Sequence, residues 1–220
     1  MTGDLMPVEI LTLQTIPNLS PGLIRALKLQ SGVRAIGMIS TDCDDVTYMA
    51  LDEATKVANV EVIYARSLYA GAANASTRLA GEVIGIIAGP TPAEVESGLQ
   101  GAVDFIRSGV GFRSASAADD VVYLAHCVSR TGTYLAKTAN VPVGQALAYL
   151  VAPPVEAVVG LDAALKASDV ELTEFFAPPT ETNFAGGLLT GTQSACQAAC
   201  DAFAQAVVET ASAPKQLGGV

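Results

Sequence analysis

Apolar residues in the first half of the chain fall into short runs that alternate with amphipathic stretches. Four runs rich in Val and Ile predict strands, and three stretches with apolar residues every three or four positions predict helices. The strands are expected over 8–16, 35–41, 61–69 and 81–89, and the helices over 20–29, 46–58 and 91–109.

Residues at the predicted helix ends support these bounds. Ser20 followed by Pro21 is typical of a helix start. Thr91, with Pro92 and Glu94 after it, forms a capping-box pattern. Gly109 is expected to end the same helix, because glycine readily adopts the left-handed conformation of that position.

The second half shows the same succession of patterns. Strands are expected over 120–128, 146–152, 171–177 and 186–191, and helices over 130–139, 155–168 and 193–211. Each half therefore follows the order β-α-β-α-β-β-α. Short strands combined with helices in this order predict a mixed sheet packed on helices, which is an α+β fold.

The letters of the two halves also recur. The segments LDEATKVANVEV (51–62) and LDAALKASDVEL (161–172) align without a gap at a shift of 110 residues, with six identities in twelve positions. The same shift pairs Gly22 with Gly132 and Ala26 with Ala136. We therefore predict two tandem domains, 1–113 and 114–220. Two similar domains in one chain suit a ring made of few subunits.

Composition restricts the class of partner. Half of the 220 residues are hydrophobic, and 12 basic against 22 acidic residues give a net charge of −10. Such a chain is a poor match for nucleic acid. No window approaches the roughly 18 apolar residues of a membrane-spanning helix, and the start has no signal-peptide pattern. We expect a cytosolic protein with no nucleic-acid or membrane partner.

The cysteines and the single histidine point to structure rather than to a metal site. Cys196 and Cys200 are four residues apart, which places them on one inward helix face. Cys43 and Cys127 are scattered, and a reducing cytosol keeps such thiols free. His126 is expected to be a hydrogen-bonded strand residue, because too few other ligands lie near it for zinc.

The stretch TDCDDV (41–46) places three carboxylates directly after a predicted strand. Asp42, Asp44 and Val46 match the D-x-D-x-[TV] pattern of phosphatases of the haloacid-dehalogenase type, in which the first Asp attacks phosphorus. A calcium loop fits poorly, because Val46 and Thr47 occupy a ligand position and the glycine position. A third interpretation is that Asp44 or Asp45 caps the helix expected to begin near Val46.

The second copy has VAPPVE (151–156) at the equivalent turn, so whatever the acids do is done once per chain. Two other stretches, 69–77 and 178–187, join equivalent strands in the two copies and are rich in small and polar residues. Such loops occur where a chain moves or where several backbones crowd together.

These features lie within uncommon strings: DCDDVTY, DEATK, VIYARSLYAGA, AGEV, VSRTGTYL, AYLVAPP, DAALK and PPTETNFAGGLLTG. With them the chain resembles the shell domain of bacterial microcompartments in its circularly permuted tandem form. Over nearly its whole length it is similar to the ethanolamine-utilisation shell proteins of the L type. The resemblance implies a structural protein and no enzyme, located in a microcompartment shell within the cytoplasm.

The resemblance also implies partners and a transport role. A homotrimer of six domains would imitate a hexagonal tile and pack beside other microcompartment shell proteins. A gated central pore and smaller ethanolamine-binding pores are expected, with no cofactor and no metal. The ligand residues match Asp44, Asp45, Glu82, Phe112, Thr182, Asn183 and Phe184. The gating loops match Ser67, Leu68, Tyr69, Ala70, Gly71, Ala72, Ala73, Asn74, Phe184, Ala185, Gly186 and Gly187.

The chemistry of these residues agrees with an ethanolamine site. An ammonium group prefers carboxylate acceptors and an aromatic face within about 6 Å. The matched set contains both, and Thr182 and Asn183 offer partners for the hydroxyl. Asp42 lies outside the set and is expected to position the turn. The alternatives are a magnesium-dependent phosphohydrolase that uses Asp42 and Asp44, and a soluble ethanolamine-binding module outside any shell. Binding of a divalent metal or a cobalamin stays open.

Overall fold

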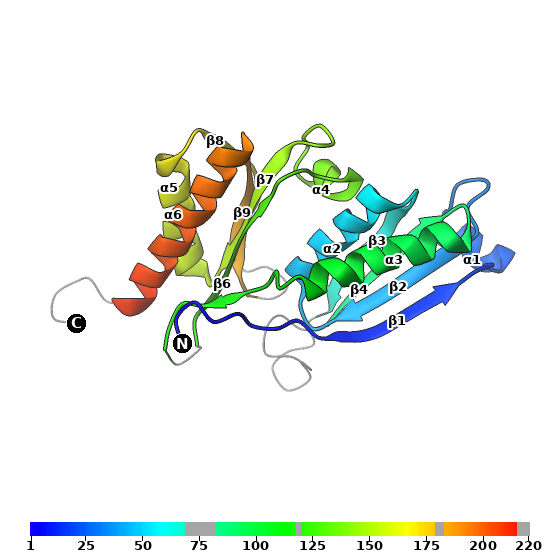
Figure 1. Cartoon of the computed structure of the whole chain (residues 1–220), viewed down its shortest axis with the longest axis horizontal. Coiled ribbons are helices and arrows are strands. Elements are labelled where there is room, and N and C mark those ends of the chain that lie inside the picture. Colours follow the sequence, from blue (N-terminus) through cyan, green and yellow to red (C-terminus); the bar gives the residue numbers. More distant parts are fainter. Residues whose placement is uncertain (69–81, 118–119, 179–182, 215–220) are drawn as a thin grey trace. The chain divides into compact units, whose positions relative to one another are not determined.

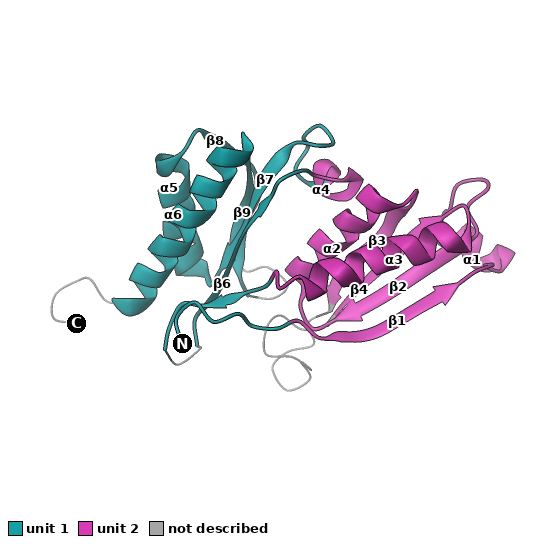
Figure 2. Cartoon of the chain, viewed as in Figure 1, with its two compact units in different colours: residues 1–7, 111–130, 138–220 teal, residues 8–110, 131–137 magenta. Residues whose placement is uncertain are grey.

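The computed structural model of the chain describes residues 1–68, 82–117, 120–178 and 183–214 (Figure 1). The chain divides into two compact units (Figure 2). Unit 2 comprises Val8–Val110 together with Thr131–Lys137, and unit 1 comprises Met1–Pro7, Gly111–Arg130 and Thr138–Val220. Each unit contains one antiparallel sheet with its own helices.

Unit 2 is built on a four-stranded sheet in the order β1-β2-β4-β3. Two helices, α2 and α3, cover one face of this sheet (Figure 1). Glycines allow their close approach, because a Cβ at Gly37 would lie 2.7 Å from Leu99 and a Cβ at Gly85 2.6 Å from Leu51. The elements are β1 (Ile10–Ile16), α1 (Pro21–Ala26), β2 (Ala35–Thr41), α2 (Asp44–Val57), β3 (Glu61–Leu68), β4 (Glu82–Gly89), α3 (Pro92–Arg107) and α4 (Thr133–Thr138).

The short helix α1 belongs to the opposite face of the same sheet. Ile36 is the neighbour of Gly37 in β2 and therefore points away from α3. There it forms a cluster with Leu19 and Ala88, against which Ile24 and Leu27 of the α1 segment pack. One side of α1 is thus fixed to its own sheet.

Unit 1 is built on a five-stranded sheet in the order β5-β6-β7-β9-β8. Helices α5 and α6 pack on each other closely, because a Cβ at Gly160 would lie 2.6 Å from the Phe203 ring. Cys196 and Cys200 are buried in this core, which confirms their predicted inward face. The elements are β5 (Arg113–Ser114), β6 (Val122–Val128), β7 (Ala146–Ala152), α5 (Pro154–Ala167), β8 (Val170–Phe176), β9 (Ala185–Gly191) and α6 (Gln193–Ser212).

The predicted α+β fold and the doubled order β-α-β-α-β-β-α are confirmed, with the two-residue strand β5 as an addition. The copies even share an irregularity. The pairing of β3 with β4 shifts between Val62 and Tyr64, and that of β8 with β9 shifts between Leu172 and Glu174. Such a bulge at the same place in both sheets supports the duplication.

The helix ends agree with the sequence in part. The Ser20 side chain accepts a hydrogen bond from Leu23 N, and Gly109 has a φ of +87° after α3, as predicted. The capping box is only half formed. Thr91 accepts from Glu94 N, but the Glu94 carboxylate accepts from Asn59 N at 2.7 Å instead of returning to Thr91. Glu94 therefore ties α3 to the turn before β3.

The register of the repeat changes along the chain. Helices α2 and α5 begin at residues 44 and 154, which keeps the shift of 110. Helices α1 and α4 begin at residues 21 and 133, which gives 112. The residues with positive φ that follow these helices keep the same spacing of 112, since Lys28 matches Asn140 and Gly32 matches Gly144. The counterpart of Leu23 is therefore Leu135, and the earlier pairing of Gly22 with Gly132 is displaced by two residues.

The compact units and the predicted shell domains are different divisions of the chain. Residues 1–7 belong to unit 1, where Gly3 N donates to Ser114 O and Met6 N donates to Phe112 O. Residues 131–137, from the second copy, belong to unit 2. The domain boundary after residue 113 stays a prediction.

Candidate functional site

The acidic turn of unit 2 lies between β2 and α2. Helix α2 begins at Asp44, and Cys43 is its N-cap without a side-chain hydrogen bond. The prediction that Asp44 or Asp45 caps a helix starting near Val46 is wrong, because both are already in the first helical turn. Asp44 Oδ1 accepts from Asp45 N at 2.9 Å, and both residues are buried, with 5% and 8% exposed. The positive end of the helix dipole favours carboxylates there.

Two threonines fix the shape of this turn. The hydroxyls of Thr41 and Thr47 lie 3.0 and 2.7 Å from the Cys43 carbonyl oxygen and 2.5 Å from each other. Cys43 N donates to Thr41 Oγ1. Burial raises the pKa of the Cys43 thiol well above its usual value, and the Asp45 and Asp44 carboxylates raise it further. The thiol is therefore neutral at physiological pH.

Asp42 has a backbone role. Its Oδ1 accepts from Glu9 N at 2.8 Å, and its own N–H donates to Glu9 O. These two bonds hold the start of β1 beside the end of β2, so Asp42 positions the turn as expected. Burial also raises its pKa. A partly desolvated carboxylate that is already bonded to the backbone is a poor match for a phosphatase nucleophile.

Glu82 begins β4 at the same end of the sheet as the acidic turn. Strands β2 and β4 are antiparallel, and Thr41 is paired with Val83. The backbone of Glu82 therefore lies at the edge from which Asp44 and Asp45 follow. The structure thus brings three of the predicted acids to one end of unit 2.

The other predicted ligand residues belong to unit 1. The rings of Phe112 and Phe184 lie 5.4 Å apart between centroids at an angle of 51°. Phe112 is fully buried, whereas Phe184 is partly exposed. Asn183 has a φ of +64°, a conformation that asparagine tolerates better than most residues. Thr182 lies outside the described residues.

The predicted gating segments are described only in part. Tyr69–Asn74 lie outside the described residues. Leu68 ends β3, and the buried Ser67 hydroxyl has no hydrogen-bond partner among the residues described. Ala185, Gly186 and Gly187 are buried residues of β9. A Cβ at Gly187 would lie 2.6 Å from Glu174 O, so a small residue is needed there for strand pairing.

One charged residue that the sequence analysis did not single out organises unit 2. Asp52 of α2 is fully buried, and its carboxylate accepts from Gly132 N at 2.7 Å and from Leu135 N at 2.8 Å. Lys56 Nζ lies 3.2 Å from the same carboxylate. Asp52 therefore caps α4. The only sequence signal was its identity with Asp162 in the repeat.

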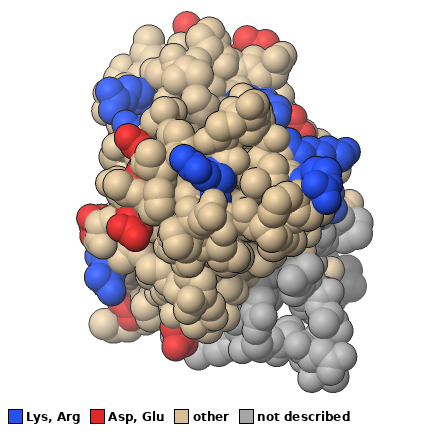
Figure 3. All heavy atoms as spheres, turned by 90° about the vertical axis from the view of Figure 1, so that its right-hand side faces the viewer, with Lys and Arg blue, Asp and Glu red and all other residues tan. Residues whose placement is uncertain are grey.

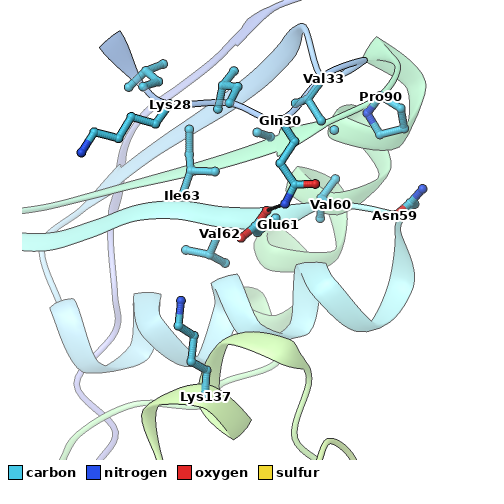
Figure 4. Close-up of a pocket in the computed structure, with 14 residues that line it drawn as sticks. Lys28, Gln30, Val33, Asn59, Val60, Glu61, Val62, Ile63, Pro90 and Lys137 are labelled. Atoms are coloured by element: carbon cyan, nitrogen blue, oxygen red, sulfur yellow. Dashed lines mark hydrogen bonds between the residues drawn. The ribbon is translucent and has the colours of Figure 1, made fainter. Parts of the chain in front are cut away.

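A hollow of about 510 Å³ opens on unit 2 between the α1 segment and the edge strand β3 (Figure 4). Its lining is mixed, with apolar side chains of the α1 segment and β3 beside polar ones, and Lys137 points toward it. Gln30 donates to Glu61 across part of it at 3.5 Å. None of the predicted ligand residues that the structure describes lines this hollow. Among the described residues, there is also no group of three His, Cys, Asp or Glu side chains that could hold a metal ion.

Within the described part of the chain, no helix has both the length and the apolar character needed to cross a bilayer. The family model described as BMC domain matches residues 35–117. The bacterial microcompartment shell protein EutL of Clostridium perfringens is 64% identical over 97% of this chain and 99% of its own length. EutL of Escherichia coli is 50% identical, with 97% of each chain covered.

Solved structures agree. The crystal structure of EutL from C. perfringens matches with a TM-score of 0.94 over 99% of both chains. That of the ethanolamine utilization protein EutL from Leptotrichia buccalis is 59% identical and has a TM-score of 0.92, covering 97% of this chain and 99% of that one. The relatives from C. perfringens and E. coli are named as shell proteins, which does not support the phosphohydrolase alternative. The chain belongs to the EutL family of bacterial microcompartment shell proteins.

Proposed function

We propose that this shell protein forms a homotrimer in the shell of an ethanolamine-utilisation microcompartment and binds ethanolamine at its acidic turn. The observation that carries the proposal is the similarity, over nearly the whole chain, to EutL proteins, of which the one from L. buccalis is named ethanolamine utilization protein. The duplicated fold supports the assembly, because three chains supply six similar domains and a six-membered ring is a shape that tiles a plane. Other shell proteins would be its neighbours in the layer.

The acidic turn supports the ethanolamine part. Asp44 and Asp45 are nearly buried beside a fixed backbone turn, and Glu82 starts the neighbouring strand. A carboxylate pair in such a place favours a small cation, and ethanolamine is an ammonium ion at neutral pH. In unit 1, the Phe112 and Phe184 rings offer an aromatic face for the ammonium group. In this proposal, Asn183 and Thr182 bond the hydroxyl group of ethanolamine.

Titration calorimetry with ethanolamine tests this site. We expect Asp44→Asn to weaken binding by about tenfold or more, because a charge-assisted hydrogen bond contributes about 1.5–3 kcal/mol. Asp104→Asn removes one negative charge from an exposed position of α3 and serves as the matched control. Equal affinities for wild type and Asp44→Asn would refute the role of the turn.

We also propose that the segments 67–74 and 184–187 gate a central pore. A ligand can shift such loops only if it binds the open and closed forms with different affinities. Crystals grown with and without ethanolamine should therefore differ in the conformation of these loops in wild type, and should not differ in Asp44→Asn.

Electron microscopy distinguishes a shell component from a soluble binding module. Concentrated protein should form flat layers with a repeating unit of three chains. Dispersed particles at every concentration, with ethanolamine still bound, would favour the soluble module.

A further inference from the structure

One buried hydroxyl of unit 2 lacks a hydrogen bond. Ser67, the residue before the last one of β3, is 9% exposed, and its Oγ has no hydrogen-bond partner among the residues described. A buried polar group without a partner costs free energy, so native proteins rarely keep one unless a ligand or an ordered water satisfies it. Ser67 therefore indicates that something binds beside it.

The pairing of the strands determines where this side chain points. Thr41 of β2 and Ser67 of β3 are both paired with Val83 of β4, so the three side chains form one row on the same face of the sheet. The Thr41 hydroxyl contacts the Thr47 hydroxyl of α2. This face is therefore the one that α2 covers, and Ser67 points toward α2.

The row of Ser67 lies at the end of α2 that carries the acids. Leu51 of α2 packs on Gly85 of β4, where a Cβ would lie 2.6 Å from it. Asp44 precedes Leu51 by about two turns on the same side of the helix, and Val83 precedes Gly85 by two residues on the same face of the sheet. Both steps lead to the N-terminal end of α2. Ser67 therefore faces the first turns of α2 from the sheet.

The hydroxyl and the two carboxylates are not bonded to one another. Asp44 and Asp45 are 5% and 8% exposed, and neither lies within hydrogen-bonding distance of Ser67 Oγ. The Ser67 oxygen thus stays available as an acceptor for a group that the acids bind. A buried acceptor that faces a pair of buried acids is suited to a cation that also carries hydrogen-bond donors.

We propose that Ser67 accepts the third N–H of the ammonium group bound at the acidic turn, and that the site thereby selects primary amines. The proposal rests on the proposed ethanolamine site and adds to it one residue and a selectivity. A primary ammonium group has three N–H donors. Asp44 and Asp45 offer acceptors for two of them, and Ser67 Oγ offers a neutral acceptor for the third.

Methylation of the amine distinguishes this contact from simple attraction between charges. N-methylethanolamine keeps the positive charge and the hydroxyl, but a methyl group replaces one N–H. When the remaining two N–H groups bond to the acids, this methyl group faces Ser67 and leaves its hydroxyl unpaired. We therefore expect wild type to bind ethanolamine about tenfold more tightly than N-methylethanolamine.

Surface charge attracts cations without such selectivity. The face of unit 2 that Figure 3 shows carries several basic side chains, with acidic ones mostly along its margins. A cation is therefore drawn to the enclosed acids of the turn rather than to this face. Replacing a serine changes no charge, so its effect on binding reports the hydrogen bond alone.

Titration calorimetry with the two amines tests the proposal. Ser67→Ala should weaken the binding of ethanolamine about tenfold and leave that of N-methylethanolamine nearly unchanged, so that the preference for the primary amine is lost. Ser97→Ala removes a hydroxyl from an exposed position of α3 and should change neither affinity. An equal loss for both amines, or no loss for either, would overturn the contact between Ser67 and the third N–H.

Thermal unfolding separates a ligand contact from a structural role. A hydroxyl without a partner does not stabilise the folded chain, so Ser67→Ala should unfold at the wild-type temperature or slightly above it when no amine is present. At one fixed concentration, ethanolamine should raise the unfolding temperature of wild type more than that of Ser67→Ala. A variant that is less stable than wild type without amine would show that the hydroxyl is structural and would contradict the proposal.

The ethanolamine site and the role of Ser67 can fail separately. If Asp44→Asn weakens ethanolamine binding and Ser67→Ala does not, the acidic turn is the site and the Ser67 contact is wrong. If wild type binds no ethanolamine, both are wrong.

Discussion

Helices α2 and α5 have the same length of 14 residues and the same place in the repeat, but their surroundings differ. The outer face of α2 meets α4 and encloses a buried carboxylate, whereas that of α5 presents valines and an exposed ion pair. A duplicated fold keeps its sheet and core in both copies. The difference teaches that the contacts on the outer faces of a duplicated fold change while its core is kept.

The largest expected difference in stability between the two helices concerns Asp52 and its counterpart Asp162. Asp52→Ala leaves two buried N–H groups without their acceptor and leaves the Lys56 ammonium with Glu53 alone, so we expect a loss of about 3 kcal/mol in the free energy of unfolding. Asp162→Ala removes only an exposed pair and should cost less than about 0.5 kcal/mol. Urea unfolding at several protein concentrations separates any contribution from assembly. Similar losses for both variants would contradict the assignment.

Substitution of Leu135 should cause the next largest loss of stability. Leu135→Ala removes a fully buried side chain of α4, and such changes cost about 2–5 kcal/mol, with the lower half expected for a short helix at the surface. The counterpart Leu23→Ala removes a side chain that is 46% exposed and should leave the stability almost unchanged. Urea unfolding measures both changes. Equal losses of stability for Leu23→Ala and Leu135→Ala would show that the two leucines do not differ in their packing.

Substitution of Gly132 should cause a smaller loss of stability. A Cβ at this position would meet Thr55 Oγ1 and lie 2.6 Å from Asp52 O, so Gly132→Ala should cost about 1–3 kcal/mol. In contrast, a Cβ at Gly22 in α1 meets no atom within 4 Å, and Gly22→Ala should be neutral or slightly stabilising. Thermal unfolding of the two alanine variants measures the difference, and an equal shift in both would argue against the tight contact at Gly132.

The smallest effect concerns alkaline pH. Burial raises the pKa of Tyr134 from 10 to about 12, and the Asp52 carboxylate adds to the shift. The unfolded chain therefore loses this proton first, so stability is full below pH 10 and decreases as the pH rises toward 12. Tyr134→Phe should remove that part of the decrease. If the free energy of unfolding fell in parallel for wild type and Tyr134→Phe between pH 10 and 12, the pKa of Tyr134 would not be raised by folding.

Sequence patterns predicted the strands well because their apolar runs end abruptly. The strands expected over 35–41 and 146–152 have these same bounds in the structure. The residues at which the helices begin were predicted less accurately. The acidic turn was expected to precede α2, but Thr41 and Thr47 hold the Cys43 carbonyl, and this allows the helix to begin at Asp44. Such side-chain bonds to the backbone leave no trace in hydrophobic periodicity.

The functional site was predicted from resemblance, and only part of it is accessible to physical reasoning. Acids directly after a buried strand indicated a cation site, and the structure places Asp44 and Asp45 together at that end of the sheet. Asp52 was overlooked because an Asp four residues before a Lys on a helix is typical of a solvated face. Its burial depends on α4, which lies about 80 residues further along the chain. Local pattern carries no information about such a contact.

The most direct test of the account is the solution mass of the unmodified protein, measured by light scattering during size-exclusion chromatography. The account predicts a species of three chains of 22.4 kDa each, stable on dilution into the low micromolar range. A single-chain mass at all concentrations would contradict the proposed trimer.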